Sequence, residues 1–69
     1  MIFRAIRWDA RYRPTVAFSR SLKRLRQFLA ENPGYRHIPA AEWQVAVNQW
    51  ARTGGQPNIV IDIDKEAEK

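Results

Sequence analysis

The sequence predicts a small α+β domain in which a helical hairpin lies on a short two-stranded ribbon, in the order β-α-α-β. Residues 2–8 and 58–64 alternate apolar residues with other residues, as half-buried strands do. Between them, apolar residues recur at helical spacing in two stretches separated by a proline-glycine turn. A chain of 69 residues has room for one hydrophobic core, so we expect one domain over residues 1–64 and a solvated tail over residues 65–69.

The first predicted strand has two distinct faces. One face carries Ile2, Arg4, Ile6 and Trp8, and the other carries Phe3, Ala5 and Arg7. Residues 9–14 break the alternation, and they therefore end the strand.

The first predicted helix begins around Thr15, because Pro14 suits the first helical turn and Thr15 can act as an N-cap. Its end is expected near Glu31, before the turn Asn32-Pro33-Gly34. The apolar stripe of this helix is Phe18, Leu22, Leu25 and Leu29. The opposite side carries Arg20, Lys23, Arg24 and Gln27, with Arg26 on the flank. The helix should therefore have one apolar and one strongly basic face.

The second predicted helix has Pro39 at its first position and ends at Gly54-Gly55. Its apolar stripe consists of Trp43, Ala46, Val47 and Trp50. Val45 lies away from this stripe, so we expect it to be exposed.

A helical hairpin would return the last strand antiparallel to the first. Arg4 and Arg7 would then lie near Asp62 and Asp64, and opposite charges across a ladder are stabilising. An isolated two-stranded ribbon is marginal, so we expect a homodimer. Two ribbons joined edge to edge and two aromatic second helices packed together are equally compatible with the sequence.

Composition narrows the classes of function. The chain has no cysteine, which excludes disulfides and thiolate metal sites. Arginines interrupt the apolar amino terminus, unlike in a signal peptide, and no apolar run approaches the roughly 20 residues that span a bilayer. We therefore expect a cytoplasmic protein. The net charge of +5 divides into +7 over residues 1–36 and −2 over residues 37–69, which favours an acidic partner, either nucleic acid or protein.

The sequence does not indicate an enzyme. His37 is the single histidine, and no phosphate-binding glycine loop or nucleophile motif accompanies it. Asp62 and Asp64 could offer two carboxylates to Mg²⁺ or Ca²⁺, but such sites need further oxygen ligands. We therefore expect no catalytic residue, no cofactor and no metal.

Binding to another macromolecule fits the residues better, because Trp, Tyr and Arg dominate interface energies. The candidate partner-binding residues are Arg7, Trp8, Arg11, Tyr12, Arg13, Arg20, Lys23, Arg24, Gln27, Tyr35 and Val45. The alternative is a small basic DNA-binding regulator, since a strand followed by two helices resembles the ribbon-helix-helix repressors. Two departures weaken that resemblance: the first strand has few outward amide side chains, and an acidic strand follows the second helix.

In length, arginine and tryptophan usage, lack of cysteine and a basic helical hairpin, the chain resembles the small early proteins with which temperate bacteriophages disable host regulators. The phage anti-quorum-sensing anti-activators are one such group. The resemblance covers the whole chain in size and character and includes no diagnostic motif, so it assigns no binding residue. It implies a homodimer that binds a LuxR-type transcription activator and keeps it from its DNA. The protein expected on this basis is an inhibitor that acts by occupancy in the cytoplasm of a bacterial host.

Overall fold

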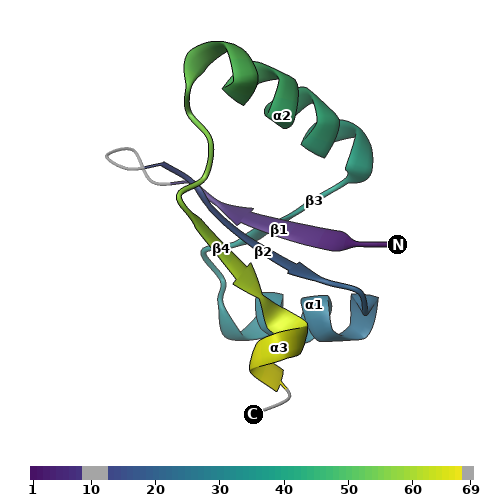
Figure 1. Cartoon of the computed structure of the whole chain (residues 1–69). Coiled ribbons are helices and arrows are strands. Elements are labelled where there is room, and N and C mark those ends of the chain that lie inside the picture. Colours follow the sequence, from purple (N-terminus) through teal and green to yellow (C-terminus); the bar gives the residue numbers. More distant parts are fainter. Residues whose placement is uncertain (9–12, 68–69) are drawn as a thin grey trace.

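The computed structural model describes residues 1–8 and 13–67 and contains a four-stranded mixed sheet between helices. The strands are β1 (Phe3–Arg7), β2 (Thr15–Ser19), β3 (Arg36–Ile38) and β4 (Ile59–Asp62), and the helices are α1 (Leu22–Glu31), α2 (Ala40–Thr53) and α3 (Ile63–Ala67). The strand order is β3-β1-β2-β4. Figure 1 shows α2 on one side of the sheet and α1 with α3 on the other. The predicted α+β class is confirmed, but the sheet has four strands where two were expected.

The segment Thr15–Ser19 corrects the prediction of a helix beginning around Thr15. It forms β2, which pairs antiparallel with β1. Its residues alternate between the two faces of the sheet, so Val16 packs in the core on the α2 side and Ala17 in the core on the α1 side. Helix α1 begins only after Ser21, whose hydroxyl accepts a hydrogen bond from the Arg24 backbone N–H at 3.3 Å. A serine N-cap therefore sets this start.

The last strand corrects the expected antiparallel ribbon. Strand β4 pairs with β2, in parallel, because β2 and β3 occupy the two sides of β1. The expected approach of Arg4 and Arg7 to Asp62 and Asp64 across a β1–β4 ladder is therefore wrong.

The strand ends at Asp62, where residues up to 64 had been expected to be extended. The Asp62 carboxylate accepts the Lys65 backbone N–H at 3.1 Å, an N-cap contact that starts α3. Helix α3 thus begins within the predicted domain and continues into the segment expected to be a tail.

The hydrophobic core has two parts, one on each face of the sheet. On the α2 side, Ile6, Val16 and Ile38 pack with Ala46 and Trp50. On the other side, Ala5, Ala17, Leu25 and Ile63 form the buried cluster. The predicted alternation of the first strand and the predicted apolar stripe of the second helix are both confirmed. Within the described residues, none of the helices combines the length and apolar character required to cross a membrane.

Helix α2 ends as its sequence predicts. Gly54 adopts a left-handed conformation with φ of 75°, and its N–H donates to the Trp50 carbonyl at 2.8 Å. This φ is unfavourable for a residue with a Cβ atom.

We expect Gly54→Ala to lower the free energy of unfolding by about 1 kcal/mol, because alanine is strained in the left-handed region. Gly55→Ala is the matched control, since a Cβ there would meet Trp50 and Thr53 only at ordinary contact distances of 3.5 Å. Urea unfolding of the two variants measures the difference. Equal losses of stability in the two variants would show that the left-handed conformation of Gly54 does not make alanine unfavourable there.

The Asp64 carboxylate joins α3 to the junction between β2 and α1. It accepts hydrogen bonds from the Ser19 hydroxyl at 2.6 Å, the Arg20 backbone N–H at 3.0 Å and the Arg24 guanidinium at 3.3 Å. The Ser19 hydrogen bond, followed by the Arg20 N–H and the charge of Arg24, lowers the pKa of Asp64 below its ordinary value. One side chain therefore connects three elements.

Because folding lowers the pKa of Asp64, its contribution to stability is present above the unfolded pKa and is lost as the pH falls through the folded pKa. We expect Asp64→Asn to lower the free energy of unfolding at neutral pH. The difference in the free energy of unfolding between neutral and acidic pH should be smaller in this variant than in the wild type. Urea midpoints of both proteins from neutral pH to about pH 3, below the usual aspartate pKa of about 3.9, test this. Parallel pH profiles of the two proteins would contradict the assignment.

Candidate functional site

The structure brings together two predicted binding residues that lie far apart in the sequence. Trp8, just after β1, and Val45, on α2, line one hollow of about 360 Å³. The other residues of this hollow are Arg36, Ile38, Ala41, Glu42, Ala46 and Gln49. It lies between α2 and β3, at one edge of the sheet. We call it the Trp8–Val45 hollow.

Aromatic packing fixes the position of Trp8. Its ring lies 6.2 Å from that of Trp50 at a tilt of 55°, and Trp50 in turn meets Trp43 edge to face at 5.5 Å. Trp50 is buried, whereas 58% of Trp8 is exposed. The indole of Trp8 is thus held on one side and presented to solvent on the other. An aromatic side chain held in this way needs little further ordering when a partner binds.

The rest of the hollow combines an apolar floor with a charged rim. Val45 is 66% exposed, as its place off the α2 stripe predicts, and Ile38 is buried. At the rim, the Arg36 guanidinium lies 3.2 Å from the Glu42 carboxylate, and both side chains are more than half exposed. An exposed pair of this kind contributes little to stability, so Arg36 can exchange Glu42 for a carboxylate of a partner.

Two other predicted binding residues, Arg7 and Tyr35, contact each other on the other face of the sheet. The Arg7 guanidinium lies 5.3 Å from the centre of the Tyr35 ring, and Tyr35 meets Phe28 edge to face at 4.8 Å. Tyr35 is half-buried against the core on the α1 side. Arg7 and Tyr35 therefore lie on the face of the sheet opposite Trp8, as the alternation of the first strand predicts for Arg7.

The basic residues Arg20, Lys23 and Arg24 do not all lie on one helix, although the sequence predicted that they would. Arg20 precedes α1 rather than lying on it, while Lys23, Arg24 and Gln27 are on its exposed side. Arg24 forms a salt bridge with Asp64 at 3.3 Å. Asp64 therefore reduces the positive charge of this side.

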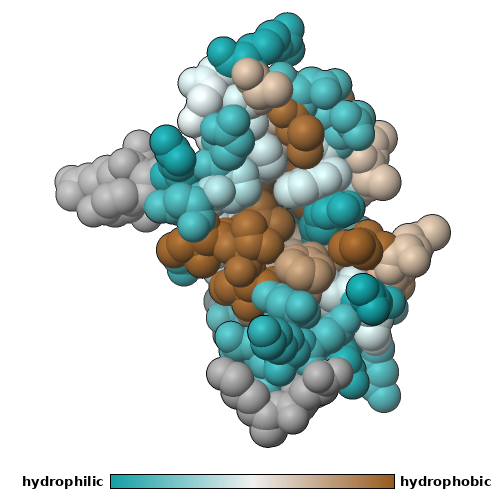
Figure 2. Space-filling view, viewed as in Figure 1, coloured by the Kyte–Doolittle hydropathy of each residue, from teal (hydrophilic) through white to brown (hydrophobic). Residues whose placement is uncertain are grey.

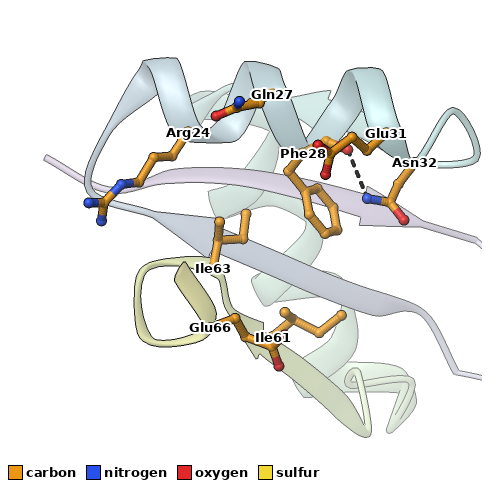
Figure 3. Close-up of a pocket in the computed structure, with 8 residues that line it drawn as sticks. All are labelled: Arg24, Gln27, Phe28, Glu31, Asn32, Ile61, Ile63 and Glu66. Atoms are coloured by element: carbon orange, nitrogen blue, oxygen red, sulfur yellow. Dashed lines mark hydrogen bonds between the residues drawn. The ribbon is translucent and has the colours of Figure 1, made fainter. Parts of the chain in front are cut away.

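A second hollow of about 530 Å³ lies between α1 and the β4–α3 segment. In Figure 3 the Phe28 ring points from α1 toward Ile61 and Ile63. Its rim carries Arg24, Gln27, Glu31, Asn32 and Glu66. Asn32 donates from its side-chain amide to the Phe28 carbonyl at 2.9 Å. Opposite charges on one rim make this hollow less suitable than a uniformly basic one for a phosphate backbone.

Of the remaining predicted residues, Arg13 is exposed, and Arg11 and Tyr12 lie outside the described residues. His37 is exposed on β3, opposite Ala5 of β1. Within the described part of the chain, no group of three His, Asp or Glu side chains is placed to hold a metal ion.

Sequence reasoning did not single out several exposed apolar and polar residues. Arg36 and Gln49 line the Trp8–Val45 hollow, and Ile59 and Val60 of β4 are 51% and 58% exposed. The alternation of the last strand predicted a half-buried element, and its position at a sheet edge could not be read from that pattern. No protein-family model matches the chain, and no curated protein or solved structure matches it.

Proposed function

We propose that this chain is a non-enzymatic binding protein that inhibits a bacterial transcription regulator by covering part of its surface. The observation that supports this is the meeting of Trp8 and Val45 in one hollow beside Arg36. An exposed aromatic ring, an apolar neighbour and an arginine are the composition that most often dominates protein interfaces. A partner would insert an apolar side chain into the hollow and place a carboxylate near Arg36.

The charge of the protein indicates the kind of surface it would meet. A net charge of +5 favours an acidic partner and faster association at low salt. Lys23 and Arg26 contribute to this field from the exposed side of α1. The resemblance to phage anti-activators narrows the proposal to a LuxR-type activator, bound in the bacterial cytoplasm by a homodimer of this chain.

We expect Trp8→Ala and Val45→Glu each to weaken partner binding about tenfold or more, since loss of an interface anchor commonly costs more than 1.4 kcal/mol. Gln44→Glu is the control for Val45→Glu. Gln44 is exposed on the same helix and does not line the hollow, and its substitution adds the same negative charge. Affinity capture from bacterial lysate after nuclease treatment, followed by titration of the captured protein, measures the effect. Capture that is equal for all three variants would remove the hollow from the proposal.

A second candidate function, binding to DNA, is supported by the exposed side of α1. Lys23, Arg26 and Gln27 are exposed there, and no acidic group of the described residues forms a salt bridge with Lys23 or Arg26. A ribbon-helix-helix arrangement is not available for this purpose, because β1 is paired on both sides and cannot join β1 of a second copy. Such DNA binding would therefore depend on α1.

We expect Lys23→Glu with Arg26→Glu to slow association with the protein partner without abolishing it, because these charges lie outside the hollow. Association rates at several salt concentrations measure this effect, with random duplex DNA as the parallel ligand. A steep salt dependence on DNA that disappears in the double variant would favour the second candidate.

A further inference from the structure

The outer edge of β4 has less protection against pairing than the outer edge of β3. The strand order places β3 and β4 at the two edges of the sheet. Strand β3 is three residues long, carries Arg36 and His37 and is followed by Pro39. Short length, charge and proline are the devices by which proteins prevent unwanted pairing at an edge. In β4 the charged Asp62 stands only at the end of the strand, and Pro57 precedes it, so the three residues Ile59, Val60 and Ile61 carry neither charge nor proline.

The side chains of this edge are apolar and exposed on both faces of the sheet. Ile59 is 51% exposed and Val60 is 58% exposed. The register with β2 places Val60 beside Val16 on the α2 side and Ile61 beside Ala17 on the α1 side. Figure 2 shows strongly hydrophobic side chains gathered over the position that β4 occupies in Figure 1.

A groove of about 390 Å³ continues this apolar surface on the α2 side. Its walls include Phe18, Trp43, Val47, Pro57 and Val60. Helix α2 therefore leaves the β4 end of this face open. A strand that pairs with β4 would add its side chains to the apolar wall of this groove. On the α1 side, the hollow beside Phe28 is a second recess next to β4.

We propose that β4 pairs antiparallel with β4 of a second copy, which joins two four-stranded sheets into one continuous sheet across a two-fold axis. This proposal rests on the homodimer part of the proposed function and names its seam. The sequence left open whether two copies join edge to edge or through their aromatic second helices. The proposal selects the edge, since α2 already buries Ala46 and Trp50 against its own sheet.

The strand is complementary to itself in one register. With the axis at Val60, each Val60 faces Val60 of the other copy, and Ile59 faces Ile61. Asn58 then faces Asp62, so an amide donor meets a carboxylate and no like charges oppose each other. A shift of the axis to Ile61 would place Val60 opposite Asp62, which is a poorer match.

The distribution of charge also favours this edge for contact between two copies. Each copy has a net charge of +5, so two copies repel each other over most of their surfaces. Residues 53–61 carry no charged side chain. The seam therefore brings two copies together where their repulsion is smallest.

A four-residue ladder buries less than the roughly 800 Å² per partner of a standard interface. The side chains beside the ladder, Phe18 and Pro57 on the α2 side, must therefore contribute to the contact. This predicts a dimer that dissociates on dilution, so the oligomeric state should be measured as a function of concentration.

Analytical ultracentrifugation of the full chain across a concentration range tests the seam. We expect the wild-type protein to form dimers and Val60→Lys to be monomeric. Val45 on α2 is at least as exposed as Val60, and we expect Val45→Lys to dimerise like the wild type. Circular dichroism shows whether Val60→Lys retains its fold. A wild-type protein that stays monomeric would overturn the homodimer. Dimers that persist in folded Val60→Lys would overturn only the seam.

Cysteine crosslinking tests the register without introducing a charge, because the chain has no native cysteine. Residues that face each other in an antiparallel pair have Cα atoms about 4.5–5.5 Å apart, which suits a disulfide. We expect Val60→Cys to form a disulfide-linked dimer on mild oxidation. Ile59→Cys should crosslink far less, because each Ile59 lies diagonal to Ile59 of the other copy at about 7–8 Å. Equal crosslinking of Val60→Cys, Ile59→Cys and Val45→Cys would overturn the register.

A partner strand is the competing occupant of this edge. Monomeric wild-type protein that loses partner binding on the Val60→Lys substitution, but keeps it with Gln44→Lys on the exposed side of α2, would assign the edge to the partner and overturn the seam. The Trp8 and Val45 variants of the hollow test the proposed partner binding separately, so failure of one proposal is distinguishable from failure of the other.

Discussion

The close pairing of Ala5 and Ala17 in the middle of the sheet is the constraint on which the rest of the structure depends. These two residues face each other across the β1–β2 ladder, and both are fully buried. Their small side chains leave room for Leu25 of α1, which is also fully buried, to approach the sheet. On the other face, Ile6 and Val16 stand opposite each other at the adjacent ladder position and meet Trp50 of α2. The two central strands are thus covered on both faces.

Helices this short cannot cover four strands equally well. Helix α1 has 10 residues and α2 has 14, and both lie over the centre of the sheet. Apolar side chains therefore emerge where this cover ends, as Trp8 near β3 and as Ile59 and Val60 at β4. The buried centre of the sheet and its apolar edges both result from short helices that lie over the central strands. The surfaces available for binding are, in this sense, a consequence of covering the central hairpin first.

Local sequence patterns predicted the elements whose signals are local. The face alternation of the first strand, the stripe of Trp43, Ala46, Val47 and Trp50 and the cap at Gly54 all depend on residues close together in the chain. Strand β2 was missed because Phe18 stands four residues before Leu22 and so fitted the helical stripe. The better local signals were the β-branched Thr15 and Val16 and the capping Ser21, which favour a strand followed by a new helix start. Strand pairing, which depends on distant residues, could not be read from these patterns.

The candidate site shows the same division between local and long-range information. The exposure of Val45 follows from its place on α2, but its meeting with Trp8 depends on how α2 crosses the sheet. Arg24 was correctly placed on an exposed helix face, yet its salt bridge with Asp64 joins residues 40 positions apart. Arg7 and Tyr35 have the residue types of an interface, and in the fold Arg7 lies over the Tyr35 ring while Tyr35 packs against Phe28. Residue type alone therefore could not separate binding residues from packing residues.

The positions of the two proposed surfaces make them compatible with each other. The Trp8–Val45 hollow lies at the β3 edge, and the proposed seam lies at β4, with two central strands between them. A dimer joined at β4 would leave the Trp8–Val45 hollow of each copy open, and the two-fold axis would relate these two hollows to each other. Such an arrangement suits a partner that is itself two-fold symmetric, because the second contact then forms at a high effective concentration. A shallow hollow and a small seam, each weak alone, would in this way produce tight binding together.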